Sequence, residues 1–377
     1  MNKVSKFTIL TLLLNSSLTI MVGSVIAPAL PAIAENLQFR WSPSLLVTLP
    51  SLGVVLFSPI IGKSVNYLGP YKLLIIGLIP YALLGFLGAF IDSNMLLIVD
   101  RLLLGAACVA IQVSVTTFIA QLFEGKDRLK LIAWQGMAIE FGGVVFLAIG
   151  GVLGELGWQY PFYIYLVALV FFLFTWKSIP KNITPSANQK SSQKSFDKRV
   201  IPILTASILS MMLFFICYVN LPAYLPSKFN FTESETGYFM SFISLIAVLV
   251  ASQLPRLTEK SSAEKLNIIG FISFVVGYLL FAFSPSSWLM IFGAFSIGIG
   301  FGLTIPLLNH MIVEVSNHQT RGKNLGLYSM MVFGGQFLAT FSDMAPLDTN
   351  LMFYYTAVIA VAFTIVQVVL FKKMNIT

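Results

Sequence analysis

Charged residues are scarce in this chain. Only 10% of its 377 residues are Asp, Glu, Lys or Arg, whereas soluble domains carry about 25%. The mean hydropathy is +0.87. These values exclude a soluble globular domain and indicate an integral membrane protein.

Cysteine and histidine are also scarce, with two residues of each. Cys108 and Cys217 both fall inside apolar runs, which excludes a disulfide framework. His310 and His318 show no paired ligand spacing, so we expect no metal site and no cofactor. An intramembrane enzyme would need a nucleophile beside a base, and the sequence shows no such pair. A channel filter and a phosphate-binding loop are absent too, which disfavours both a channel and an ATP-driven pump.

Long apolar runs are what the chain has instead. A spanning helix needs roughly 20 apolar residues, and the sequence contains twelve such runs, which predict an all-α membrane protein. They lie near residues 8–31, 44–62, 71–91, 95–119, 130–154, 160–178, 200–222, 235–255, 265–284, 287–313, 324–344 and 350–371. In the run 287–313, closely spaced glycines and Pro306 predict a kink.

The basic residues predict the orientation of these helices. If the N-terminus is cytoplasmic, 20 of the 23 Lys and Arg residues fall in cytoplasmic segments, as the positive-inside rule requires. Both termini are then cytoplasmic. The net charge of +8 is thereby explained without a nucleic-acid partner.

One polar stretch divides the chain into two halves. The segment "KSIPKNITPSANQKSSQKSFDKRV" predicts a cytoplasmic linker over 179–199, between six-helix bundles at 1–178 and 200–377. "KDRLKLIAWQGMAIEFGG" in the first half resembles "QTRGKNLGLYSMMVFGG" in the second, and Arg128 and Arg321 are 193 residues apart. A repeat of six plus six helices is typical of one large transporter fold, which binds substrate between its halves.

Four segments carry a family resemblance: "SVIAPALPAIAENL", "GKSVNYLGPYKLLIIG", "VDRLLLGAACV" and "AIGGVLGELGWQYPFYI". The chain resembles the major facilitator superfamily, and most of all its twelve-helix drug:proton antiporter-type exporters. The resemblance assigns a conformational role to the glycines and neighbours of these motifs, namely Gly62, Asn66, Gly69, Gly105, Gly150 and Gly151. Asn66 stands where the family usually has an acidic residue, and Phe146-Leu147 stands where the antiporters have Gly-Pro.

Helix 95–119 places Asp100 and Arg101 inside an apolar span, where charges are costly and need a partner. By helical spacing Arg101 shares a face with Gly105, Cys108, Gln112 and Thr116, which predicts a wet cavity wall. Asp100 points about 100° away and is a weaker candidate for proton coupling.

Glu140 is the predicted partner of Arg101. The carboxyl lies about 15 Å deep in the next helix and Arg101 about 10 Å from the opposite surface, so in a core of about 30 Å the two lie at similar heights. We therefore expect an ion pair that protonation of Glu140 releases. A static pair that only fixes helix packing is the alternative.

Other polar side chains fall within the spans and are candidate substrate contacts, although hydrogen bonding between helices explains them equally well. These are Asn15, Gln112, Asn220, Asn309, His310 and Gln336.

The resemblance implies a monomeric secondary transporter of a bacterial cytoplasmic membrane. It would export small amphipathic organic molecules in exchange for protons by alternating access, with the lipid bilayer, a small-molecule substrate and protons as its partners. Two alternatives stay open. One is a dedicated exporter of a metabolite such as a carboxylate siderophore, which Arg101 would attract. The other is a facilitator or importer, because the Gly-Pro pair is absent.

Overall fold

The computed structural model describes residues 4–181, 198–316, 320–344 and 348–374. Helices dominate these ranges, and no strand occurs within them. The chain divides into two compact units, Met1–Asn188 and Gln189–Thr377. Most of our predicted linker, residues 182–197, lies outside the described residues.

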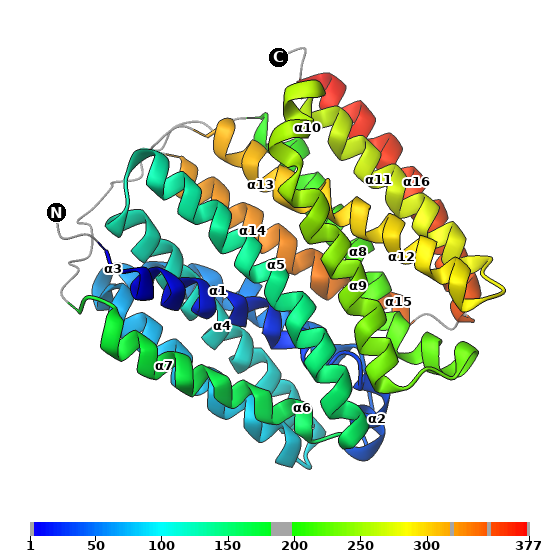
Figure 1. The fold of residues 1–377 in the computed structure, drawn as a ribbon, viewed down its shortest axis with the longest axis horizontal. Helices are drawn as coiled ribbons and strands as arrows, with labels where there is room; N and C mark the ends of the chain where they lie inside the picture. The colour runs from blue at the N-terminus through cyan, green and yellow to red at the C-terminus, as the bar shows by residue number, and fades with distance from the viewer. Residues whose placement is uncertain (1–3, 182–197, 317–319, 345–347, 375–377) are drawn as a thin grey trace. The chain divides into compact units, whose positions relative to one another are not determined.

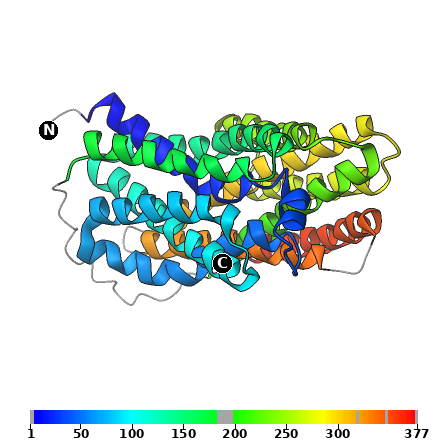
Figure 2. The ribbon, with the colours of Figure 1, turned by 90° about the horizontal axis from the view of Figure 1, so that it is seen from below.

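The described residues of the first unit form seven α-helices and two short 3-10 turns (Figure 1). Their bounds are α1 Lys6–Ser24, α2 Leu30–Asn36, α3 Leu45–Leu87, η1 Gly88–Phe90, α4 Asn94–Leu122, α5 Gly125–Leu156, α6 Tyr160–Tyr163, η2 Ile164–Leu166 and α7 Val167–Ser178. Within this unit α3 packs along α4, and α1 contacts α4, α5 and α7. Figure 2 shows α7 beside α1.

The second unit contains nine α-helices in its described residues. Their bounds are α8 Val200–Phe229, α9 Glu233–Ser252, α10 Leu254–Lys260, α11 Ala263–Ala282, α12 Ser287–Gly302, α13 Ile305–Glu314, α14 Arg321–Leu338, α15 Thr340–Asp343 and α16 Thr349–Met374. Here α8 packs on α14, α12 packs on α9, and α11 packs on both α12 and α16.

Side-chain caps fix where several helices begin. Ser93 caps α4 by accepting a hydrogen bond from the Leu96 backbone N–H. Thr232 and Glu235 form a capping box at the start of α9, in which each side chain accepts from the other's backbone N–H. These caps satisfy backbone donors that the first helical turn leaves free.

Two helix interruptions follow from glycine and proline. Within α3, Gly69 has φ 76° and ψ 159°, a conformation that side-chain-bearing residues avoid, and Pro70 follows it directly. The predicted kink in the run 287–313 is confirmed. There α12 ends at Gly302, and α13 begins with Ile305 and Pro306. The proline lies in the first turn of α13, where its missing N–H breaks no helical hydrogen bond.

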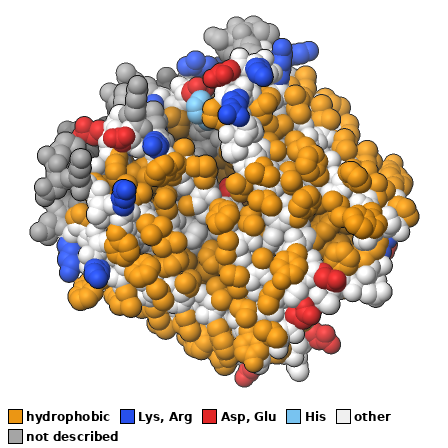
Figure 3. All heavy atoms as spheres, in the orientation of Figure 1, with side chains coloured by type: hydrophobic (Ala, Val, Ile, Leu, Met, Phe, Trp, Pro, Cys, Tyr) orange, Lys and Arg blue, Asp and Glu red, His pale blue; other side chains and the backbone are white. Residues whose placement is uncertain are grey.

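Ten helices among the described residues are long and apolar enough to cross a membrane. The longest such stretch, Leu45–Phe90, has 46 residues and contains the break at Gly69. In Figure 3 hydrophobic side chains cover most of the face shown, and most charged side chains lie toward its margins. The chain is therefore an all-helical, multi-pass membrane protein.

In each unit, one long helix packs against the unit's first helix at a glycine. A Cβ atom at Gly142 of α5 would lie 2.9 Å from Ser17 Cβ of α1. In the second unit a Cβ at Gly335 of α14 would lie 2.4 Å from the Ile208 carbonyl oxygen of α8. Gly142 and Gly335 both belong to the segments "FGG", at 141–143 and 333–335, that the two halves share. In each unit a glycine of this segment thus lets its helix, α5 or α14, pack closely on the first helix, α1 or α8.

Candidate functional site

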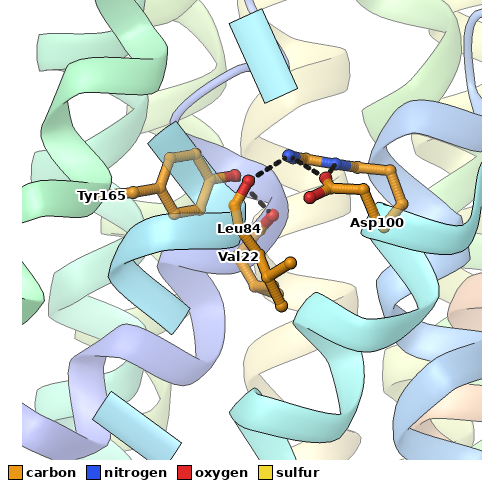
Figure 4. Close-up of polar contacts among 5 residues, drawn as sticks. Val22, Leu84, Asp100 and Tyr165 are labelled. Carbon is orange, nitrogen blue, oxygen red and sulfur yellow. Dashed lines mark hydrogen bonds and ion pairs between the residues drawn. The ribbon is translucent and has the colours of Figure 1, made fainter. Parts of the chain in front are cut away.

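A buried ion pair lies in the second turn of α4. Arg101 is fully buried, and Asp100 is 4% exposed. The guanidinium donates two hydrogen bonds to one carboxylate oxygen, Asp100 Oδ2, from Nε at 2.9 Å and from Nη2 at 2.7 Å (Figure 4). Charge-assisted bonds of this kind are about twice as strong as neutral ones, so each residue neutralises the other within the apolar unit.

The end of α3 completes the surroundings of Arg101. Its Nη2 also donates to the Leu84 carbonyl oxygen at 3.1 Å. The guanidinium carbon lies 5.6 Å from the centre of the Phe162 ring and 5.8 Å from that of Tyr165, within range of cation–π attraction. A Cβ at Gly88 would lie 2.1 Å from Arg101 Nη2, so the position after α3 must be glycine for this arrangement.

Side chains around the ion pair also hold α1. The Tyr165 hydroxyl donates to the Val22 carbonyl oxygen at 2.8 Å, as Figure 4 shows. The Tyr81 hydroxyl donates to the Leu18 carbonyl oxygen at 2.6 Å. Both tyrosines are fully buried. The sequence predictions missed them, because a sequence does not show which tyrosine hydroxyl in an apolar run faces a carbonyl oxygen of another helix.

The predicted pair of Arg101 with Glu140 is wrong for this structure. Among the described residues, Arg101 forms its ion pair with Asp100, and Glu140 forms none. The helical wheel placed Asp100 about 100° from Arg101 by the direction of the Cα–Cβ bonds. The long arginine side chain nevertheless turns back around the helix and reaches its neighbour. Glu140 is partly exposed on α5.

The predicted cavity wall along α4 is also wrong at its charged end. A Cβ at Gly105 would lie 2.1 Å from the Pro50 carbonyl oxygen of α3, and the Cys108 thiol contacts the Thr19 carbonyl oxygen of α1 at 3.9 Å. This face of α4 therefore packs on α1 and α3. Only its other end is less buried: Gln112 is partly buried and Thr116 is exposed.

Three of the six candidate substrate residues are buried. Asn15 donates to Thr175 Oγ1 of α7 at 2.9 Å, and its own Oδ1 is buried without a partner in the described part of the chain. Asn220 donates to Ser342 Oγ at 2.9 Å. Gln336 is 5% exposed. In this conformation Asn15 and Asn220 hold helices together. Hydrogen bonding between helices was the alternative to substrate contact that the sequence left open.

The other three candidates are more accessible. Gln112 and Asn309 are partly buried, and His310 is exposed. His310 Nδ1 lies 3.5 Å from a carboxylate oxygen of Glu314, one turn later on α13. No group of three or more His, Cys, Asp or Glu side chains comes together in the described ranges, so they contain no metal-binding cluster.

The residues of the predicted conformational motifs fall into two groups. Gly62 and Asn66 are exposed on α3, and Gly69 forms its break. Gly105 packs on α3. In α5 a Cβ at Gly150 would lie 2.1 Å from the Val25 carbonyl oxygen, and Gly151 is buried beside it. Gly105, Gly150 and Gly151 form the second group, and they serve close packing of helices.

Comparison with known proteins gives relatives of similar length. The chain is 23% identical to multidrug resistance protein 1 of Bacillus subtilis (strain 168), over 94% of this chain and 95% of that protein. It is 25% identical to the class B tetracycline resistance protein of Escherichia coli, over 85% and 82%. The quinolone resistance protein NorA of Staphylococcus aureus (strain MSSA476) is 24% identical, over 94% and 93%.

Solved structures share the fold. A bacterial homologue of the human lysosomal transporter Spinster, inward-facing and unoccupied, matches with a TM-score of 0.79 and 14% identity, over 99% of both chains. A mutant of the nucleoside transporter NupG matches with a TM-score of 0.75 and 18% identity, over 97% and 99%. The family model described as "Major Facilitator Superfamily" matches residues 12–340. The chain is therefore a member of the major facilitator superfamily, a family of membrane transporters.

Proposed function

We propose that this transporter exports small amphipathic organic molecules in exchange for protons. The observation that carries the proposal is its similarity, over 94% of the chain, to multidrug resistance protein 1 and to the quinolone resistance protein NorA. The relatives named above come from bacteria, so we place the protein in a bacterial cytoplasmic membrane. That it is a monomer is part of the proposal, as the family resemblance implies.

Twelve spans with both termini cytoplasmic belong to this proposal. The break at Gly69 divides the 46-residue stretch Leu45–Phe90 into two spans. The helix α14, with 18 residues, supplies a further span, because the bundle of the second unit includes it against α8. The distribution of Lys and Arg then places both termini in the cytoplasm.

Glu140 is the residue that we propose exchanges protons. It lies in the stretch Lys130–Leu156 of α5, which is long and apolar enough to cross a membrane, and it has no ion-pair partner among the described residues. An ionised carboxylate in that environment is costly, and protonation removes its charge. The Arg101–Asp100 pair, by contrast, is already neutral as a whole and fixes α4 against the end of α3. Alternating access would then follow the protonation state of Glu140.

The transport proposal is tested by dye accumulation in cells. Overproduction of the protein should lower accumulation of a fluorescent organic cation such as ethidium, and a protonophore should restore it. Competition by a panel of organic compounds would then define the substrate class. Unchanged dye levels together with efflux of a single metabolite would instead identify a dedicated exporter, and increased uptake would identify an importer.

The role of Glu140 has its own test. Glu140→Gln keeps the size of the side chain but cannot lose a proton, so we expect proton-driven efflux to stop while folded protein stays in the membrane. Glu124→Gln is the matched control and should transport normally, because Glu124 is exposed at the start of the same helix and its side chain makes no cap hydrogen bond. Full transport by Glu140→Gln would refute this role.

A further inference from the structure

A groove on the surface of the first unit lies beside the ion pair. It has a volume of about 290 Å³ and is formed by the end of α3 and the beginning of α4. This volume is near the lower end of the range of about 300–1,000 Å³ that small-molecule sites occupy. All of its lining residues lie within Leu84–Leu103, so one unit builds the groove alone.

The lining is apolar except for Asp100. Phe90 and Leu96 are 54% and 55% exposed, and Val99 and Leu103 are 42% and 41% exposed. These side chains present a hydrocarbon surface toward the surroundings of the unit. In a membrane such a surface accepts an alkyl chain without loss of any hydrogen bond.

Asp100 is the one polar residue of the groove lining, and one of its two carboxylate oxygens is an unused acceptor. Both hydrogen bonds from Arg101 end on Oδ2. The other oxygen, Oδ1, accepts no hydrogen bond from any residue that the structure describes. A carboxylate oxygen has two lone pairs to offer, and in an apolar setting an unused charged acceptor is expensive. A ligand in the groove that donates a hydrogen bond to Asp100 Oδ1 would therefore satisfy this oxygen.

The charge of the site selects the kind of donor. Arg101 already neutralises Asp100, so an added ammonium group would leave a net positive charge in an apolar groove, which is unfavourable. A neutral hydroxyl satisfies Oδ1 without adding charge. An alkyl chain attached to that hydroxyl covers Phe90, Leu96 and Val99.

We propose that this groove binds a neutral amphipathic alcohol from the bilayer, with its hydroxyl on Asp100 Oδ1 and its alkyl chain along the apolar lining. The site would take single-chain alcohols and lipids with a free hydroxyl next to the chain. It does not depend on the transport function proposed above, because it involves neither Glu140 nor proton exchange.

Photolabelling of the full-length protein in phosphatidylcholine nanodiscs tests the proposal. The probe is dodecanol that carries a diazirine on its chain, and its methyl ether is the matched compound without a donor. We expect saturable labelling of Phe90, Leu96, Val99 and Leu103 by the alcohol, and about tenfold weaker labelling by the ether, because one hydrogen bond to a charged acceptor is lost.

Two variants separate the groove from the general lipid surface. Leu96→Trp should fill the groove and remove the saturable labelling. Leu173→Trp changes an equally exposed leucine of α7, at 56% exposed, and should leave the labelling intact. Equal labelling by alcohol and ether, labelling spread evenly over exposed apolar residues, or stronger labelling by a dodecylammonium probe would each overturn the proposal.

Discussion

Loss of either partner of the Arg101–Asp100 pair should destabilise the protein strongly. Asp100→Asn leaves the guanidinium fully buried with no countercharge, and Arg101→Gln leaves a carboxylate that is 4% exposed in the same position. Both hydrogen bonds between them are short, at 2.9 and 2.7 Å. The unpaired charge that remains in each single variant is the dominant cost.

The expected magnitude follows from this burial. Removal of one member of a buried ion pair costs about 3–5 kcal/mol, and we expect that loss in the free energy of unfolding of each single variant. The double variant Asp100→Asn/Arg101→Gln buries two neutral amides and no charge. Its loss should therefore be smaller than the sum of the single losses by more than about 1 kcal/mol.

Equilibrium unfolding of the purified protein in mixed detergent micelles measures these values. Asp92→Asn is the matched control, because Asp92 is exposed just before α4 and should change the stability by less than about 0.5 kcal/mol. Single losses below about 1 kcal/mol, or strictly additive losses in the double variant, would show that the two groups do not neutralise each other.

Two further substitutions test the surroundings of the pair. Gly88→Ala places a methyl group 2.1 Å from the present position of Arg101 Nη2 and should lower the free energy of unfolding by about 1–3 kcal/mol. Gly62→Ala is the control, because a Cβ there has nothing within 4 Å, and it should leave the free energy of unfolding unchanged. Equal effects of the two variants would contradict the crowding at Gly88. Tyr165→Phe removes the donor to the Val22 carbonyl oxygen and should lower the free energy of unfolding by about 1 kcal/mol; no change would show that this bond does not stabilise α1.

Hydropathy and residue type predicted most of the fold. The apolar runs predicted the long helices, because a bilayer permits few alternatives to a helix of that length. Gly69 and Pro306 marked breaks that backbone geometry requires. The number of twelve spans stays a prediction, since ten helices of the described residues have the length and hydropathy of a span and α14, with 18 residues, is less apolar than its neighbours.

The ion pair shows where sequence reasoning stopped. The sequence predicted that Arg101 needs a partner of opposite charge, and the structure gives it one in Asp100. The helical wheel set Asp100 aside from backbone directions alone, and the similar depth of Glu140 in the membrane then favoured that residue on another helix. Side-chain length decided the outcome, because an arginine can reach a neighbour that points a third of a turn away.

Packing partners were the least predictable part of the site. Gly88, Tyr81 and Tyr165 act through contacts with residues far away in the sequence, and a single chain carries no sign of those contacts. The polar residues Asn15 and Asn220 looked the same in sequence whether they face a substrate or a neighbouring helix. Only their hydrogen bonds to Thr175 and Ser342 distinguish the two.

Proton exchange against substrate is measured most directly in liposomes that contain the purified protein and an internal pH dye. With no imposed pH gradient, addition of ethidium outside should drive protons out of the lumen, so the internal pH should rise as the dye enters. Glu140→Gln should abolish this rise. Entry of ethidium without any change of internal pH, or with acidification of the lumen, would contradict proton-coupled exchange.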